Sequence, residues 1–163
     1  MEPVLFVIFG AIATGGAIMV VTRKHPMASA LYLILTLFAV AALFVLRQAH
    51  FLAAIQVIVY AGAVVVLFIF VIMLINVPED KLPVERVTGM RLLGAVAAGF
   101  LVLETAVVAR RFGMPDGSAA DHGSVRAVGR ALFTDYLLAF EVTSILLLAA
   151  VIGAIALAKR KPS

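Results

Sequence analysis

Long apolar runs separated by short polar segments organise this sequence. Five runs carry few or no charges, and each is close to the length of about 20 residues that crosses a bilayer as an α-helix. Runs this long predict helices rather than strands, because strands are usually much shorter. The predicted membrane spans cover residues 3–21, 27–46, 51–77, 92–109 and 136–158.

Polar residues mark the boundaries of these runs. Segments 22–26, 47–48 and 78–80 end the first three, and each carries charge. The link between the last two runs, residues 110–135, is rich in Gly, Ser and charge, and we predict a long loop there. The whole chain, residues 1–163, is then a single membrane domain.

Composition agrees with this pattern. Hydrophobic residues make up 64% of the chain and charged residues 13%, whereas soluble domains are nearer one half and one quarter. These values predict an all-α integral membrane protein. No Lys or Arg precedes the first run, so we expect that run to be retained rather than cleaved as a signal peptide.

Basic residues gather at the ends of the apolar runs, where they set topology, so the net charge of +4 does not indicate nucleic-acid binding. Cytoplasmic segments carry the excess of Lys and Arg, which favours an outer N-terminus and an inner C-terminus. In that orientation eight basic residues lie inside and five outside. The inner set is Arg23, Lys24, Lys81, Arg86, Arg91, Lys159, Arg160 and Lys161, and the outer set is Arg47, Arg110, Arg111, Arg126 and Arg130.

The residue types needed for redox chemistry are scarce. The chain has no cysteine, which excludes disulfides, cysteine-ligated iron–sulfur clusters and covalently attached c-type haem. His25, His50 and His122 lie in or beside connecting segments, not at mid-membrane where a helical bundle holds haem. We therefore predict no catalytic, cofactor-binding or metal-binding residue on this chain.

Two carboxylates fall inside predicted spans, where ionisable groups are functional candidates by default. Glu104 lies near the outer end of its span, where an interfacial carboxylate that reaches headgroups or Arg110 and Arg111 is the simpler interpretation and a functional role is the alternative. Glu141 lies near the outer start of the last span, with Tyr136, Thr143 and Ser144 within a turn. Structural anchoring and a functional polar patch both remain open for Glu141.

The third run, VIVYAGAVVVLFIFVIMLIN at residues 57–76, holds a hydroxyl and a glycine together inside the membrane. Gln56 and Tyr60 are four residues apart and share one helix face, which Ala53 and Ala63 continue with small side chains. Such a face points toward protein or water rather than lipid. A single interhelical hydrogen bond from Tyr60 is the simpler alternative.

Length and composition predict irregular winding in the same run. Residues 51–77 span roughly 40 Å as a helix, against a hydrocarbon core of about 30 Å. Gly62 precedes the β-branched residues 64–66, which have modest helix propensity, so a π-bulge is favoured there. Because one extra residue in a turn rotates the helix beyond it by roughly 100°, losing the bulge would swing Phe68 and Phe70 relative to Gln56 and Tyr60.

Three stretches resemble one family. IQVIVYAGAVVVLFIFVIMLIN resembles the third transmembrane helix of the J subunit of bacterial NADH:quinone oxidoreductase, respiratory complex I, whose mitochondrial counterpart is chain 6. HPMASALYLIL resembles the start of that family's second helix. SVRAVGRALFTDYLLAFEVTSILLLAAVIGAIALAKR resembles the family's segment from the periplasmic loop through the fifth helix.

The resemblance implies a non-redox, multi-pass subunit of a bacterial inner-membrane translocase. Its partners would be the quinone-binding heel and the antiporter-like pumping subunits, while FMN, iron–sulfur clusters and quinone would be bound in partner subunits. In that family the third helix switches between a π-bulged and a regular α form and gates a water path. Carried over, the proton-path and gating residues are Tyr60, Gly62, Val65, Val66, Phe68, Gln56 and Glu141, with Gln56 as a hydrogen-bonding group only.

Other functions compete with this interpretation. A purely structural membrane scaffold fits the same residues, and related complex I-like hydrogenases or dehydrogenases use similar subunits. A small transporter or channel acting alone predicts more intramembrane charges or an internal repeat, and the sequence gives little support for either.

Overall fold

The computed structural model describes residues 2–75, 88–112 and 123–159, which form helices joined by turns. The prediction of an all-helical membrane protein is confirmed over these residues. The elements are α1 (Glu2–Thr22), α2 (Pro26–Leu46), α3 (His50–Ile55), the π-helical η1 (Gln56–Val64), α4 (Val65–Ile75), α5 (Thr88–Phe112), α6 (Val125–Phe133) and α7 (Leu137–Ala158).

Four helices are long and apolar enough to cross a membrane: α1, α2, α7, and the continuous helix of 26 residues, His50–Ile75, formed by α3, η1 and α4. We call this continuous helix the third helix. These four coincide with the predicted spans 3–21, 27–46, 51–77 and 136–158, except that residues 76 and 77 lie outside the described residues. The predicted span 92–109 lies within α5, whose apolar part, Leu92–Val108, is about 25 Å long as a helix and thus shorter than the hydrocarbon core.

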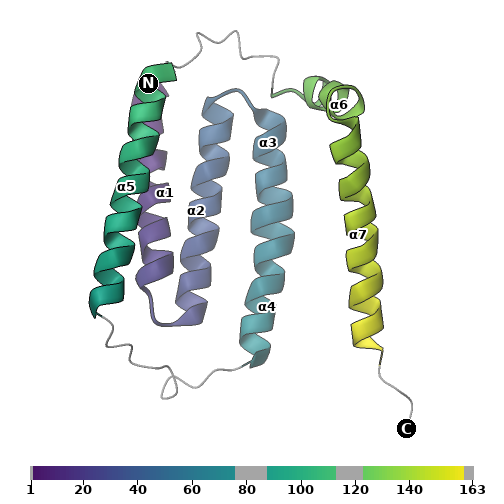
Figure 1. The fold of residues 1–163 in the computed structure, drawn as a ribbon, viewed down its shortest axis with the longest axis horizontal. Helices are drawn as coiled ribbons and strands as arrows, with labels where there is room; N and C mark the ends of the chain where they lie inside the picture. The colour runs from purple at the N-terminus through teal and green to yellow at the C-terminus, as the bar shows by residue number, and fades with distance from the viewer. Residues whose placement is uncertain (1, 76–87, 113–122, 160–163) are drawn as a thin grey trace.

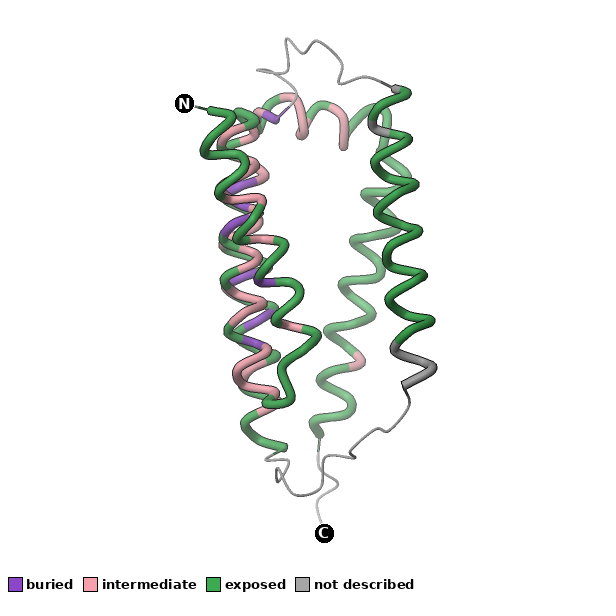
Figure 2. The backbone as a smooth tube through the Cα atoms, turned by 90° about the vertical axis from the view of Figure 1, so that its left-hand side faces the viewer, coloured by how far each residue is buried: buried purple, intermediate pink, exposed green. Residues whose placement is uncertain are grey.

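α1, α2 and the third helix form a bundle with α2 in the middle (Figure 1). Its buried apolar residues are Ala30, Ala39 and Ala41 on α2, and Ala53, Ala61 and Val65 on the third helix. Small side chains at these positions let the helix backbones approach closely, which is how helices associate in a membrane without a hydrophobic driving force. Figure 2 places the buried and half-buried residues mainly in this bundle.

The contact between α1 and α2 depends on a glycine. A Cβ atom on Gly16 would overlap the Thr36 hydroxyl and lie 3.5 Å from the Tyr32 carbonyl oxygen. Near the turn, the Ser29 hydroxyl donates a hydrogen bond to the Val20 carbonyl at 2.5 Å, which joins the two helices through side chain and backbone. Arg23, directly after α1, also donates to the Tyr32 hydroxyl of α2 at 3.3 Å. Close backbone approach and these two hydrogen bonds therefore hold this pair.

A tight C-terminal cap reverses the chain between α2 and α3. Gln48 has φ 60°, in the left-handed region that usually holds Gly or Asn. Its N–H donates to the Val45 carbonyl, and the Ala49 N–H donates to the Phe44 carbonyl, each at 2.9 Å. Together these bonds form the Schellman motif, which satisfies the last carbonyls of α2.

The predicted loop over residues 110–135 is wrong at both ends. α5 continues to Phe112, and α6 occupies Val125–Phe133. Ser124 caps α6 by accepting a hydrogen bond from the Ala127 N–H at 3.2 Å. Apolar residues at 125, 128 and 132 follow helical spacing, a short amphipathic period that the abundance of Gly and charge in this segment obscured.

α5 and α7 differ from the bundle. Within the part of the chain that the structure describes, α7 packs closely only on α6, and α5 packs along none of the other helices. The described side chains of α5 and α7 are exposed almost throughout, as the uniform colour in Figure 2 shows. These two helices present apolar surfaces that the other described residues do not cover.

Candidate functional site

The third helix changes its winding at mid-length. Gln56–Val64 is π-helical, between α-helical segments on either side. At its end, the Val65 N–H faces the carbonyl oxygens of Gly62 and Tyr60, and the bond to Tyr60 is of the i→i+5 type that defines π winding. The helix passes through this segment without a break, so its backbone groups remain paired inside the membrane.

Gly62 lies where this winding leaves little room for a side chain. A Cβ atom there would sit 3.1 Å from the Val57 carbonyl oxygen, five residues earlier in the chain. With any other residue at this position, the Val57 carbonyl would have to shift by a few tenths of an ångström. Glycine avoids this tight contact within the π-helical segment.

The burial pattern follows the extra residue in the turn. Ala53, Ala61 and Val65 are the buried residues of the third helix, and α2 is the neighbour they pack on. In a regular α-helix, Val65 would lie about 120° around the axis from Ala53, because each residue turns by about 100°. One additional residue removes about 100° of this offset. The π segment thus keeps both halves of the third helix in contact with α2.

This winding corrects the predicted helix face. The face Ala53, Gln56, Tyr60 and Ala63 was drawn with α-helical periodicity, but Ala63 is exposed and Tyr60 is 51% exposed. Ala61, which that periodicity placed elsewhere, is buried. The error has a physical cause: the extra residue turns the positions after it toward a different side.

Six of the seven predicted site residues lie together on the third helix. Gln56, Tyr60 and Gly62 belong to η1, and Val65, Val66 and Phe68 to the first turn of α4. Gln56 and Gly62 are half-buried, Val65 is 3% exposed, and Val66 and Phe68 are 57% and 49% exposed. In this segment Val65 is packed on α2, whereas the bulky neighbours Val66 and Phe68 are exposed.

Glu141 lies apart from this group. It is exposed in the second turn of α7, and in the described structure α7 does not pack on the third helix. The Ser144 hydroxyl donates to the Glu141 carbonyl at 2.7 Å, and the Thr143 hydroxyl donates to the Ala139 carbonyl at 2.7 Å. These hydroxyls are engaged with their own helix backbone. The carboxylate of Glu141 is thus left open to a neighbour or to water.

The chemistry available at η1 is limited to hydrogen bonding and packing. Tyr60 offers a hydroxyl and Gln56 an amide, and the remaining side chains from Gln56 to Phe68 are apolar. Among the described residues, no three His, Asp or Glu side chains gather as metal ligands. An apolar segment with two hydrogen-bonding groups suits control of water access rather than covalent chemistry.

Comparisons with known proteins place this chain in a family. Residues 16–157 match the family described as NADH-ubiquinone/plastoquinone oxidoreductase chain 6. The chain is 40% identical over 162 residues to the NAD(P)H-quinone oxidoreductase chain 6 of Leptolyngbya boryana, covering 99% of this chain and 81% of the relative. It is 37% identical over 166 residues to the NADH-quinone oxidoreductase subunit J of Rhodobacter capsulatus, covering 95% and 80%.

A third relative is the NADH-quinone oxidoreductase subunit J of Escherichia coli, 36% identical over 156 residues, with 91% of this chain and 82% of the relative covered. The matches extend over nearly the whole chain and include every element from α2 to α6. The resemblance drawn from the sequence is confirmed: this chain belongs to the family of NADH-ubiquinone/plastoquinone oxidoreductase chain 6, which includes the bacterial J subunits.

Proposed function

We propose that the chain is the J subunit in the membrane arm of a proton-translocating NADH:quinone oxidoreductase in a bacterial inner membrane. It carries no catalytic centre of its own, and FMN, iron–sulfur clusters and quinone are bound by partner subunits. Family membership and the membrane-spanning helices support this assignment. The partners are the quinone-binding heel and the antiporter-like subunits.

The proposed topology has five spans in a single membrane domain, with α5 as the fourth. The N-terminus lies outside and the C-terminus inside. α5 runs from the end of the molecule where α1 meets α2 back to the end where the N-terminus lies (Figure 1), as a spanning segment between α4 and α7 must. The apolar stretch of α5 is short for a membrane span. A tilted or protruding helix of a partner subunit would cover the parts of α5 beyond this stretch.

The proposed mechanism is a change of winding at η1. If the extra residue is lost from the wide turn, α4 rotates by about 100° relative to α3. On α-helical periodicity, Tyr60 and Val64 each lie within about 20° of the Ala53 direction, so they replace Ala61 and Val65 on the face toward α2. A bulky Tyr then enters a contact now made by Ala, which gives the two forms different packing.

In this proposal, rotation of α4 determines whether a water path can form beside η1. Phe68 and Val66 are on open faces of α4 in the π form, and rotation moves them around the axis together. An apolar constriction excludes water and therefore protons, whereas a path lined by the Tyr60 hydroxyl and the Gln56 amide admits them. Quinone chemistry in a partner would bias one winding, and the winding would open or close the path. Glu141 lies apart from η1 on α7, so in this proposal its carboxylate joins the path through water or a partner subunit between the two helices.

Cysteine labelling tests the change of winding directly. Because the chain has no native cysteine, single variants Val64→Cys and Val65→Cys report the exposure of each position, with the labelled peptide of this chain identified by mass. In the resting enzyme we expect Val64→Cys to react faster, since Val64 is 52% exposed and Val65 is 3% exposed. During turnover the difference between the two labelling rates should become smaller, or Val65→Cys should become the faster of the two. The same order and ratio in both conditions would contradict the switch.

Proton pumping tests the role of Gly62. Gly62→Leu forces a side chain against the Val57 carbonyl, whereas Ala63→Leu adds similar bulk at an exposed neighbour. We expect assembled Gly62→Leu complex to oxidise NADH with a reduced proton-to-electron ratio, and Ala63→Leu complex to keep the normal ratio. An unchanged ratio in Gly62→Leu complex would remove the gating proposal while leaving the subunit assignment intact.

Variants of Tyr60 and Glu141 distinguish a gating subunit from a purely structural one. Tyr60→Phe and Glu141→Gln preserve shape and remove one hydroxyl or one charge. If the chain gates protons, we expect each variant to assemble normally and to pump less per electron. Normal pumping in both would identify the chain as a structural subunit. Co-purification with hydrogenase components in place of an NADH-oxidising module would assign it to a related complex.

A further inference from the structure

α6 is fixed at the level of the helix ends from both sides. At its start, Gly123 is buried on the turn between α2 and α3, where a Cβ atom would come within 2.6 Å of the Ala49 Cα atom. At its end, the Tyr136 N–H donates to the Ala131 carbonyl at 2.9 Å, and α7 begins at Leu137. Phe133 also packs edge-on against Phe140 of α7, with ring centroids 5.2 Å apart.

This double attachment sets the depth of α6 in the bilayer. Both the turn before α3 and the start of α7 are ends of membrane-spanning helices, and Figure 1 shows α6 across the same end of the molecule. A helix held there lies in the interface between headgroups and acyl chains. Its two sides differ accordingly: Val128 and Leu132 are half-buried, while Arg126 and Arg130 are exposed.

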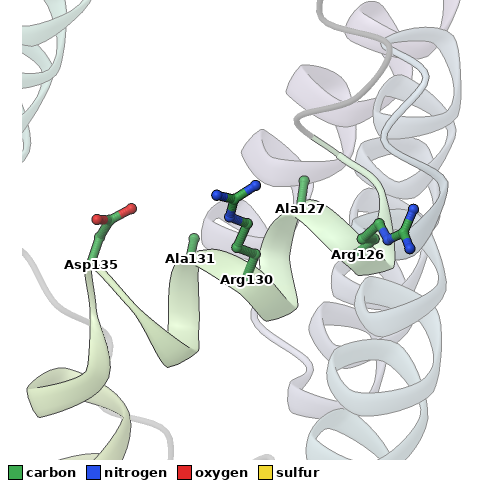
Figure 3. A pocket seen from close by; sticks show the side chains of 5 residues that line it. All are labelled: Arg126, Ala127, Arg130, Ala131 and Asp135. Carbon is green, nitrogen blue, oxygen red and sulfur yellow. The ribbon is translucent and has the colours of Figure 1, made fainter.

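The polar side of α6 forms a pocket of about 250 Å³ lined by Arg126, Ala127, Arg130, Ala131 and Asp135 (Figure 3). The two arginines are four residues apart, so they are neighbours on the helix surface. Ala127 and Ala131 leave space between the long side chains. In Figure 3 the charged ends of Arg130 and Asp135 rise on the same side of α6, whereas the Arg126 side chain extends away from them at the other end of the pocket.

The pocket is positively charged at the two arginines of α6 and negatively charged at Asp135. Arg126 and Arg130 both line the pocket, and each guanidinium can donate two parallel hydrogen bonds to a phosphate. Asp135, beyond the C-terminal end of α6, offers a carboxylate. The complementary ligand therefore carries a phosphate next to a hydrogen-bonding cation and lies at the depth of lipid headgroups.

From this placement we propose that α6 binds a phospholipid headgroup of the phosphoethanolamine type. Arg130 holds the phosphate, the long Arg126 side chain turns toward it when the lipid binds, and Asp135 accepts hydrogen bonds from the primary ammonium. The bilayer provides this ligand at the depth where α6 is fixed. The assignment concerns a surface distant from η1 and stands independently of the proposed gating.

Fluorescence quenching in vesicles tests the site with the full chain. The chain has no Trp, so Tyr136→Trp, next to Asp135, supplies a single reporter. The host vesicles are digalactosyldiacylglycerol, a bilayer lipid without phosphate, into which brominated phosphatidylethanolamine is titrated. We expect saturable quenching at a low mole fraction of the brominated lipid. Quenching that rises only in proportion to that fraction, as for random mixing or a site made for protein, would overturn the proposal.

Paired variants assign the phosphate contacts. Arg126→Gln/Arg130→Gln should raise the half-quenching mole fraction roughly 25-fold, because each of the two arginines contributes about a fivefold effect at about 1 kcal/mol per basic residue. The control Arg110→Gln/Arg111→Gln removes the same charge from the end of α5, which lies on the same side of the molecule (Figure 1), and should leave it unchanged. Equal losses in both pairs would overturn the proposal, because they would indicate general surface charge.

Two further variants complete the test. If the double variant lacks the helical circular dichroism of the parent, Arg130→Gln alone decides: at least a twofold rise supports the site, and no change overturns it. Asp135→Asn should weaken brominated phosphatidylethanolamine and strengthen brominated phosphatidylglycerol, which lacks the ammonium. The parent protein binding phosphatidylglycerol more tightly than phosphatidylethanolamine would overturn the role of Asp135.

Discussion

The three-helix bundle and the pair α5 and α7 follow different packing rules within one chain. The bundle buries alanines and keeps Gly16 against α2, so its helices approach closely. α7 has comparable hydropathy, but its side chains stay exposed and Gly153 has nothing within 4 Å of an added Cβ atom. Apolar character places a helix in the membrane, whereas small residues facing a neighbour determine which helices associate.

The largest expected effect breaks the bundle at its closest point. Gly16→Leu inserts a side chain into the space of the Thr36 hydroxyl, while Gly15→Leu adds the same atoms where nothing lies within 4 Å. We expect Gly16→Leu to lower the free energy of unfolding by about 3 kcal/mol, as strong overpacking does, and Gly15→Leu to change it little. Unfolding in sodium dodecyl sulfate, followed by circular dichroism, measures both. Equal losses would show that α1 does not depend on this contact.

The second effect asks whether partners cover α7. Leu146 is 67% exposed, so Leu146→Ala should leave the stability of the chain alone unchanged within about 0.5 kcal/mol. In the assembled complex, a helix covered by another subunit loses about 2 kcal/mol on the same truncation. The midpoint of detergent-induced dissociation measures this difference. A complex insensitive to Leu146→Ala would place this side of α7 against lipid.

The third effect compares adjacent valines in the bundle. Val65 is packed on α2 and Val66 faces outward. Val65→Ala should lower the free energy of unfolding by about 1 kcal/mol through lost packing, and Val66→Ala by less than about 0.5 kcal/mol. The same unfolding assay applies. A larger loss from Val66→Ala would mean that the third helix is wound differently in the folded protein.

The smallest effect is a gain at the turn that joins two bundle helices. Gln48 occupies a left-handed conformation that costs a side-chain-bearing residue about 1 kcal/mol, and glycine adopts it freely. Gln48→Gly also loses the contact between the Gln48 side chain and the His50 ring at 3.3 Å. We expect a net gain of about 0.5 kcal/mol in the free energy of unfolding, read from the same detergent midpoint.

Most of the fold was predictable from the sequence because apolar length has a direct physical meaning in a bilayer. Pro26 and the polar segment 22–26 end the first run within a residue or two of the observed helix boundary. α6 was missed because its helical period covers only nine residues in a segment rich in Gly and charge. Ser124 followed by amphipathic spacing was the available signal.

The candidate site was only partly predictable. Gly62 beside a β-branched run indicated where the winding changes, since both features weaken regular α geometry. The buried face was not predictable, because Ala61 reaches α2 only through the extra residue, and a sequence read with one fixed period assigns Tyr60 to that face. Partner choice for α7 is likewise absent from the pattern, since its apolar residues surround the helix on all sides.

The seating of Gly123 on Ala49 has a consequence for biogenesis. Ala49 sits on the reversal that exists only after α2 and the third helix have inserted, whereas Gly123 leaves the ribosome much later. Gly123 therefore packs on a turn formed by the first half of the polypeptide, so α2 and the third helix must insert before α6 and α7 can take their final positions. If insertion of the third helix were delayed, Gly123 would lack the Ala49 contact that positions α6.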